Sequence, residues 1–221
     1  MSRPDAAPDG YGGVIRADAA DAIALSQVIA EAFLDLPPSW WLIADQAVRR
    51  QIFPEYFRIF VEAALADGIV QTIPDRTAVA IWLPSGTGEP SLADDSPAAD
   101  EPDGYVTRLT AVTQPWTSRF LAFDTAIESR HPVGPAHHHL AFLAVRPDRQ
   151  GLGTGTALLL AHHQFLDRQA NLPAYLEASA PRSREFYLRH GYVDLGPPNY
   201  LPDGGPPMYP MWRAPGGSVL C

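Results

Sequence analysis

Three glycines that alternate with other residues stand between a strand-like run and a helix-like run. They are Gly151, Gly153 and Gly155, within the stretch RPDRQGLGTGT at residues 146–156. Glycine lets backbone amides converge on phosphate oxygens, and a helix that begins here adds unpaired N–H groups and the positive end of its dipole. The pattern predicts a pyrophosphate site that needs no lysine. A tight turn that uses glycine only for its geometry is the alternative.

A run of histidines offers a second kind of chemistry. His137, His138 and His139 are consecutive, and strand residues point alternately to opposite faces, so at most His137 and His139 share a face. Two histidines rarely hold zinc alone, and His162 and His163 are adjacent on an expected helix. We therefore predict no bound metal. We expect one strand histidine, with His139 as the candidate, to act as a base or as a substrate contact.

Residue types that are missing exclude several mechanisms. All 16 basic residues are arginine and lysine does not occur, which excludes a Walker P-loop, Schiff-base chemistry and pyridoxal chemistry. The one cysteine is Cys221, so we expect no disulfide framework, cysteine zinc site or cysteine nucleophile. The net charge of −9 argues against nucleic acid or an anionic membrane as a partner, and it suits a cationic small molecule better.

The expected strands and helices, which must position these residues, indicate an α/β fold. Their order combines hairpins with βαβ crossovers, which implies a mixed, mostly antiparallel central sheet flanked by helices. The expected strands are residues 13–17, 69–73, 77–83, 138–145, 174–179, 192–195 and 208–212, and the expected helices are residues 18–33, 45–66, 105–130, 152–169 and 182–190.

The length and composition indicate a single domain over residues 1–221. Hydrophobic residues make up 46% of the chain, enough for a substantial core. Residues 84–104 contain six acidic residues and no arginine, which predicts a flexible acidic loop, and residues 105–130 form a helical insertion. No apolar run approaches the roughly 18 residues of a membrane span, and the first ten residues lack a signal-peptide layout. We expect a cytoplasmic protein, monomeric or homodimeric.

A dinucleotide-binding fold is a competing interpretation of the glycine turn. That fold uses G-x-G-x-x-G near the start of its sheet and an acid about 20 residues later, a spacing that Glu177 satisfies. Neither register completes the motif, because Thr156 or Leu158 stands where the third glycine belongs. Only 65 residues follow Thr156, too few for the remaining parallel strands. The sequence therefore does not favour this interpretation.

The glycine turn resembles the acetyl-CoA signature of the Gcn5-related N-acetyltransferase (GNAT) family, Q/R-x-x-G-x-G/A after a strand, at residues 150–155. Residues 173–192 (PAYLEASAPRSREFYLRHGY) resemble the closing motif of that family. The runs LEASAPR at 176–182 and VAIW at 79–82 are most similar to members that acetylate an aminonucleoside antibiotic. The resemblance implies a GNAT-type sheet with a V-shaped splay between its fourth and fifth strands, and acetyl-CoA as co-substrate.

The resemblance also implies which residues bind acetyl-CoA. The thioester carbonyl and the pantetheine arm would lie against the backbone of the signature strand, and the pyrophosphate would lie on the amides of the glycine turn. Many relatives place an asparagine after the next strand, whereas this chain has Ala180, Pro181 and Ser183 there. The implied cofactor-binding residues are Leu143, Ala144, Val145, Arg149, Gln150, Gly151, Leu152, Gly153, Thr154, Gly155, Thr156 and Ser183, with Arg146 as a further candidate counter-ion.

Three residues are implied as catalytic: Tyr187, Glu177 and His139. Tyr187 occupies the position of the family's usual general acid, and a half-buried structural tyrosine is the alternative. Glu177 is the first candidate for the base, since its apolar neighbours are expected to desolvate it and raise its pKa. The alternative for Glu177 is a structural carboxylate paired with Arg182.

We therefore predict an N-acetyltransferase that moves acetyl from acetyl-CoA to an amine of a small molecule. The candidate substrate is an amine-bearing antibiotic, for resistance or biosynthetic tailoring. One alternative of the same fold is a protein or peptide N-acetyltransferase, which needs an open groove. Alternatives of another class are a non-catalytic CoA-binding sensor and a partner module that uses residues 84–130.

Overall fold

A computed structural model describes residues 13–86 and 104–216. In these ranges the chain forms a mixed sheet with strand order β1-β2-β3-β4-β5-β8-β6, and β7 pairs with β8. Neighbouring strands are antiparallel except β4 and β5, which are parallel. The strands are β1 (Ile15–Arg16), β2 (Ile69–Thr72), β3 (Ala78–Ser85), β4 (His137–Val145), β5 (Ala174–Ala178), β6 (Val193–Asp194), β7 (Asn199–Tyr200) and β8 (Pro207–Arg213).

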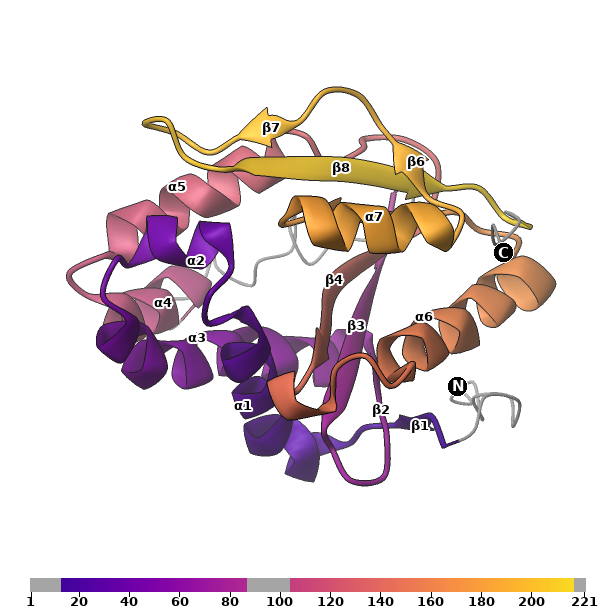
Figure 1. Ribbon diagram of the computed structural model, residues 1–221, viewed down its shortest axis with the longest axis horizontal. Helices are drawn as coiled ribbons and strands as arrows, with labels where there is room; N and C mark the ends of the chain where they lie inside the picture. Colours follow the sequence, from indigo (N-terminus) through magenta and orange to yellow (C-terminus); the bar gives the residue numbers. More distant parts are fainter. Residues whose placement is uncertain (1–12, 87–103, 217–221) are drawn as a thin grey trace.

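Helices cover both faces of this sheet. Figure 1 shows α1 to α5 gathered on one side of β3 and β4, with α6 on the other side. None of the helices in the described part of the chain is both long and apolar enough to cross a bilayer. The α-helices are α1 (Ala22–Phe33), α2 (Pro37–Leu42), α3 (Gln46–Asp67), α4 (Tyr105–Thr113), α5 (Thr117–Glu128), α6 (Thr154–Phe165) and α7 (Pro181–Arg189).

The alternating side chains of β3 build a core on each face of the sheet. Val79 and Ile81 are buried in the core beneath α1, α3, α4 and α5. Ala78, Ala80 and Trp82 are buried in the second core, which includes residues of α6 and α7. A strand that is buried on both faces reads as a continuous apolar run, as residues 78–82 do.

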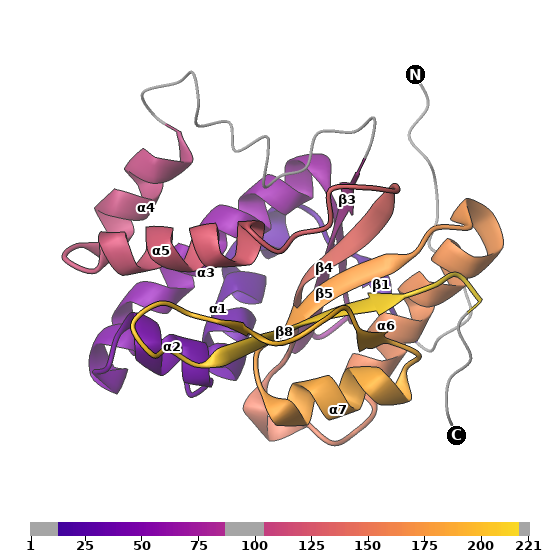
Figure 2. The same cartoon turned by 90° about the horizontal axis from the view of Figure 1, so that it is seen from above.

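The sheet splits open between β4 and β5. Their parallel pairing joins His138 with Ala174 and His139 with Tyr175, and beyond that point β5 pairs with β8. Figure 2 shows β5 between β4 and β8. In β4 the pairing with β3 passes from Leu140 to Phe142, so Ala141 is the extra residue of a β-bulge. A bulge bends its strand and increases the local twist, which accounts for the divergence at this point. The predicted splay between the fourth and fifth strands is confirmed.

One buried arginine fixes the corner between α1, α2 and α3. The Arg49 side chain is 2% exposed, and its guanidinium donates hydrogen bonds to the carbonyl oxygens of Leu34, Ile43 and Ala44 at 2.8 to 2.9 Å. It also bonds to the Asp35 carboxylate at 3.2 Å. These bonds satisfy carbonyls at the ends of α1 and α2, so the corner is rigid.

Several expected elements differ in their details. The expected helix at 105–130 is two helices, since Pro115 lacks an N–H and its predecessor Gln114 is extended, with ψ at 140°. Helix α2 was not expected, although Pro37 suits the first turn of a helix. Strand β3 continues to Ser85, into the expected acidic loop. The rest of that loop, residues 87–103, lies outside the described residues.

Candidate active site

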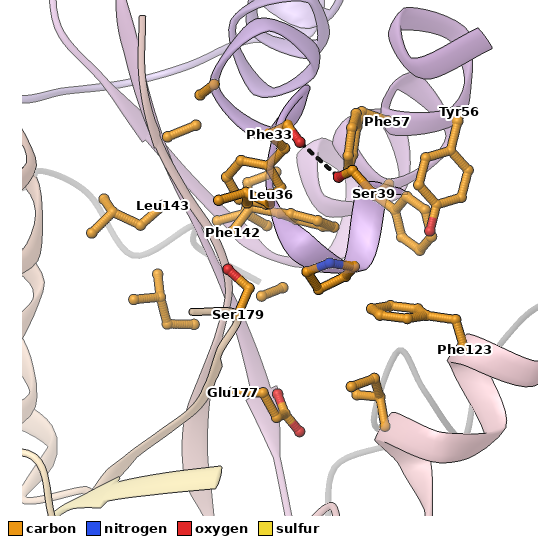
Figure 3. Close-up of a pocket in the computed structure, with 18 of the residues that line it drawn as sticks. Phe33, Leu36, Ser39, Tyr56, Phe57, Phe123, Phe142, Leu143, Glu177 and Ser179 are labelled. Carbon is orange, nitrogen blue, oxygen red and sulfur yellow. Dashed lines mark hydrogen bonds between the residues drawn. The ribbon is translucent and has the colours of Figure 1, made fainter. Parts of the chain in front are cut away.

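A cavity of about 650 Å³ lies where β4 and β5 diverge. Its walls come from α1, α2 and α3 on one side, from α4 and α5 on another, and from the facing edges of β4 and β5. Glu177 and Ser179 project into it from the β5 side, and Phe142 and Leu143 lie on the β4 side (Figure 3). Gln150, at the start of the glycine turn, and Tyr187 of α7 also line it. The splay therefore brings Gln150 and the candidate catalytic residues to one cavity, whereas Arg149 and residues 151–156 are not among its lining residues.

The glycine turn has the backbone conformation that glycine favours. Gly151 has φ +80° and Gly153 has φ +84°, and a Cβ atom at either position would meet nothing within 4 Å. Gly153 is also the N-cap of α6, with no side-chain cap. The first backbone bond here runs from the Ala157 N–H to the Gly153 carbonyl, so the earlier N–H groups of α6 have no acceptor in the helix. The open space and the free donors fit a pyrophosphate.

Arg146 and Arg149 flank the turn, and they differ in how strongly each is already bound to a carboxylate. The Arg146 guanidinium is bonded twice to the Asp148 carboxylate, at 2.6 and 2.9 Å. The Arg149 side chain is half exposed, and it lies 3.8 Å from the same carboxylate. The Gln150 amide donates to the Val145 carbonyl at 3.1 Å and so ties the turn to the end of β4. Of the two candidate counter-ions, Arg149 is the freer.

The signature strand has one backbone edge beside the cavity that no strand pairs with, and on that edge the Val145 carbonyl accepts from the Gln150 amide. Leu143, Ala144 and Val145 pair with Ala80, Val79 and Ala78 of β3. On the other edge β5 has already diverged, so alternate N–H and C=O groups of residues 143–145 face the cavity. These groups can bond to an extended amide such as the pantetheine arm.

Glu177 and His139 form a hydrogen-bonded pair. Glu177 Oε2 lies 3.0 Å from His139 Nε2, and Glu177 Oε1 accepts from the Tyr175 hydroxyl at 2.6 Å. Burial acts to raise the pKa of Glu177. The charge and hydrogen bond of His139, the hydrogen bond from Tyr175 and the charge of His131 outweigh burial, so the pKa of Glu177 is lowered. The expected upward shift is therefore wrong. The partner of Glu177 is His139 rather than Arg182.

The remaining histidines divide between the two faces of β4. His137 shares a face with His139 and lies with its Nε2 3.2 Å from the Nε2 of His131. His138 points to the opposite face, where its Nδ1 lies 2.9 Å from His162 Nε2. The expected alternation of faces is confirmed.

Three groups in the cavity region could hold a metal ion. One ligand atom each from His131, His139 and Glu177 lie within 4.8 Å of one another. His131 was not among the residues expected here, because it precedes β4 in a loop. In the described structure these groups already bond to protein partners, namely His137 for His131, and each other for His139 and Glu177.

Tyr187 lies on α7 and is 9% exposed. Its ring packs against Phe186 and Tyr192, with centroid distances of 5.3 and 5.6 Å. Burial raises the pKa of its hydroxyl well above the ordinary value, so the group stays protonated throughout the neutral range. Tyr187 is thus a hydrogen-bond donor at the cavity wall.

Ser183 has a local structural role. Its hydroxyl accepts from the Ala180 N–H at 3.1 Å and donates to the Ala180 carbonyl at 2.9 Å, across the first turn of α7. The residue also lines the cavity.

The cavity has an aromatic side that the sequence did not single out. Rings of Phe33, Phe57, Phe142, Phe60 and Tyr105 are in contact in that order, with centroid distances of 5.5 to 5.8 Å. We call these five residues the aromatic wall. Asp124 of α5 was also missed, although it shares the apolar face of its helix with Phe120 and Phe123. An acid on an apolar helix face was the available signal.

The fold defined by this splayed sheet is that of the GNAT acetyltransferases. Residues 119–194 match the family model described as acetyltransferase (GNAT) domain, which is about a third of the chain. The matched segment includes β4, the glycine turn, β5 and α7.

Solved structures of this class match the chain over nearly its full length. One from Corynebacterium glutamicum, described as histone acetyltransferase HPA2 and related acetyltransferase, has a TM-score of 0.64 and 24% identity over 94% of this chain and 98% of that one. Arylalkylamine N-acetyltransferase 2 from Aedes aegypti has a TM-score of 0.60 and 13% identity, covering 91% and 97%. PaiA N-acetyltransferase from Thermoplasma acidophilum, in complex with coenzyme A, has a TM-score of 0.54 and 11% identity, covering 91% and 97%. At these identities the likeness establishes the fold.

Proposed function

We propose that this protein transfers the acetyl group of acetyl-CoA to the primary amine of a small molecule. One observation carries the proposal: a single cavity joins Gln150, where the glycine turn begins, and the open edge of β4 to the Glu177–His139 pair and Tyr187. The coenzyme A complex of the Thermoplasma acidophilum protein supports the choice of donor.

Residues of the turn and of β4 would hold the donor. The N–H groups of residues 151–156 would bond to the pyrophosphate, with Arg149 as counter-ion, and the free edge of residues 143–145 would bond to the pantetheine amides. When bound, acetyl-CoA supplies an activated acyl group as a thioester. The open space at Gly151 and Gly153 supports this placement, because it leaves room for phosphate oxygens beside the backbone.

His139 is the proposed proton acceptor, with Glu177 as its positioning residue. A hydrogen bond from His139 Nε2–H to Glu177 leaves the lone pair on Nδ1, which can take the proton of the attacking amine. The carboxylate stabilises the imidazolium that forms. Glu177 itself is a weaker candidate than the sequence suggested, because its pKa is lowered and both of its oxygens are engaged.

Tyr187 is the proposed donor to the leaving sulfur. The amine nitrogen forms a bond to the carbonyl carbon, the C–S bond breaks, and the departing thiolate receives a proton. A phenol with a raised pKa is protonated at every neutral pH, and it stabilises the developing negative charge by hydrogen bonding as the sulfur leaves. No step in this scheme uses a metal ion.

The fixed elements around the cavity support a small acceptor rather than a long peptide. Met208 of β8 lines the cavity, and the segment from β7 to β8 is tied to α2 and α5, since Trp41 Nε1 donates to the Pro202 carbonyl at 3.1 Å and Asn199 Nδ2 donates to the Ala126 carbonyl at 2.5 Å. An extended peptide needs a groove that is open at both ends. The runs at 176–182 and 79–82 resemble those of puromycin N-acetyltransferase, which supports an amine-bearing antibiotic as the substrate class.

A thiol-release assay tests the proposal. Purified protein is mixed with acetyl-CoA and one amine at a time, from a panel of amine antibiotics, aryl amines, polyamines and peptides, and the acetylated product is identified by mass spectrometry. We expect release that depends on the amine and favours small aromatic amines. Preferential acetylation of peptides would replace the small-molecule proposal, and acetyl-CoA binding without transfer to any amine would favour a sensor.

A further inference from the structure

The part of the cavity farthest from the glycine turn ends at a partly buried acid. Asp124 Oδ2 accepts a hydrogen bond of 2.6 Å from the Tyr105 hydroxyl. Burial raises the pKa of Asp124 to about 6, and the nearby charge of Glu128 adds to this effect, while the bond from Tyr105 opposes it. No basic group in the described residues contributes to lowering that pKa. Asp124 is therefore a carboxylate without a cationic partner in the part of the chain that the structure describes.

The charged groups around this end of the cavity are mostly negative. Asp124, Glu128 and Glu177 all line it. Arg108 is the one arginine among the described lining residues, and its guanidinium is paired with Glu62 at 2.6 Å. The potential inside the cavity consequently favours a cation over a neutral or anionic ligand.

The aromatic wall also favours a cationic ligand. It leads from Phe142, which stands next to Leu143 on β4, through Phe60 to Tyr105, in two ring-to-ring steps of 5.5 and 5.8 Å. Tyr105 then donates to Asp124. Phe123 and Phe57 face the same space (Figure 3). Aromatic faces attract organic cations and contact flat apolar groups, whereas they give a hydrated inorganic ion no ligand.

We propose that the Tyr105–Asp124 end of the cavity binds a second cationic group of the acceptor. The preferred substrate is then a diamine: its reacting primary amine lies near His139, an aromatic spacer lies along the aromatic wall, and a distal ammonium group bonds to Asp124. This inference rests on the proposed acetyl transfer for the role of the first amine. Two ring-to-ring steps of 5.5 and 5.8 Å give the wall a length that a spacer of one or two aromatic rings can contact.

Two benzylamines that differ only at the distal group test the inference. One is 4-(dimethylaminomethyl)benzylamine, whose tertiary amine cannot form a stable amide, and the other is its carbon isostere 4-isobutylbenzylamine. For the unmodified protein we expect kcat/KM to favour the diamine by roughly tenfold. In Asp124→Asn we expect the ratio to fall below about threefold, because the amide keeps the shape and loses the charge. The control Glu55→Gln removes an exposed acid of α3 outside the cavity, and it should keep the wild-type ratio.

A binding measurement separates this inference from the proposed function. The probe is 1,4-bis(dimethylaminomethyl)benzene, which carries two cationic groups and cannot be acetylated, and its affinity is measured by calorimetry with wild-type protein and Asp124→Asn. Roughly tenfold weaker binding to the variant supports the second-cation site even if no amine is acetylated. Equal affinity for both proteins, together with an unchanged kcat/KM ratio, would overturn it even if both benzylamines are acetylated.

Discussion

The Nε2 of His139 lies 3.0 Å from Oε2 of Glu177, across the last point at which β4 and β5 are still paired. His139 pairs with Tyr175 in the parallel ladder, and the Tyr175 hydroxyl bonds to the other oxygen of Glu177. The imidazole and the carboxylate are therefore fixed at the apex of the splay. In the proposed function, the acceptor amine would meet this pair where the strands begin to separate.

The pair predicts different effects for its two members. His139→Gln removes the proposed proton acceptor, so kcat/KM should fall by roughly 10²- to 10⁴-fold. Glu177→Gln keeps the imidazole and removes the carboxylate that positions it, so the loss of kcat/KM should be smaller. Steady-state kinetics with the same amine measures both losses.

Tyr175→Phe is the matched control for this experiment. It removes one hydrogen bond of Glu177 and leaves the contact of the carboxylate with His139 intact, so kcat/KM should fall less than in Glu177→Gln. A wild-type kcat/KM in His139→Gln would show that the base lies elsewhere.

Tyr187→Phe should lower kcat by roughly 10²- to 10⁴-fold, while the affinity for acetyl-CoA changes little. The physical reason is that the hydroxyl acts only as the sulfur leaves. Tyr192→Phe is the control, because this neighbouring tyrosine bonds to His163 at 3.1 Å on the core side. That control should reduce thermal stability more than turnover. A near-normal kcat in Tyr187→Phe would reduce the residue to a packing role.

Local patterns predicted the parts of the site that lie close together in sequence. Residues 146–156 contain the strand end, the glycines and the helix start, so their geometry follows from short-range rules. The alternation of faces along residues 137–139 also follows from strand geometry alone. The splay required more than local patterns, because it depends on the Ala141 bulge and on a pairing that stops after His139.

The far end of the cavity could not be predicted, because it is assembled from distant segments. Tyr105 and Asp124 lie on different helices, and the break at Pro115 that brings these helices side by side was missed. The aromatic wall was missed because its five residues come from α1, α3, α4 and β4 and form no motif in the sequence. The pKa direction of Glu177 was also missed, because its shift depends on His139, which is 38 residues away.

Gly153→Ala should weaken acetyl-CoA binding by about tenfold or more. A side chain at φ +84° is strained, and its Cβ would occupy the open space proposed for phosphate oxygens. Gly204→Ala is the matched control, since Gly204 has φ +71° and similar open space but lies outside the glycine turn, in the segment before β8. Both variants should lose a similar amount of stability, of the order of 1 kcal/mol. Calorimetric titration with acetyl-CoA should distinguish them, and equal affinities would remove the turn from the cofactor site.

Dialysis against a chelator should leave the transferase activity unchanged, whereas added Zn²⁺ should inhibit it. The scheme uses His139 as a base, and a metal ion bound by His131, His139 and Glu177 would replace the His139–Glu177 hydrogen bond that leaves the Nδ1 lone pair available to the amine proton. His131→Gln removes one of the three ligands and should weaken the inhibition. Loss of activity on chelation, with recovery on adding Zn²⁺, would contradict the metal-free scheme.

Acid should destabilise the fold through histidines that are buried without charge. Burial lowers the pKa of His138 to about 4 and that of His163 to about 3, whereas an unfolded histidine titrates near 6.5. Between these values the unfolded chain binds more protons, so the free energy of unfolding is highest above pH 6.5 and falls as the pH drops toward 4. Each such histidine contributes a slope of about 1.4 kcal/mol per pH unit at most. Asp124 has the opposite effect on stability. Because its pKa in the folded chain is raised to about 6, the folded chain binds up to one proton more than the unfolded chain at this residue below that pH.

Urea unfolding followed by tryptophan fluorescence at pH 5 and pH 7.5 measures this slope. We expect clearly lower stability at pH 5, with proton uptake on unfolding. The variant His163→Leu removes one of the two histidines together with a buried Nδ1 that has no hydrogen-bond partner among the described residues. The slope of its unfolding free energy against pH should therefore be smaller, by up to the contribution of one proton. The substitution also removes the hydrogen-bond partner of the Tyr192 hydroxyl. Equal stability of the wild-type protein at both pH values would mean that these histidines are protonated in the folded state, which their burial among Trp82, Phe165 and Tyr192 opposes.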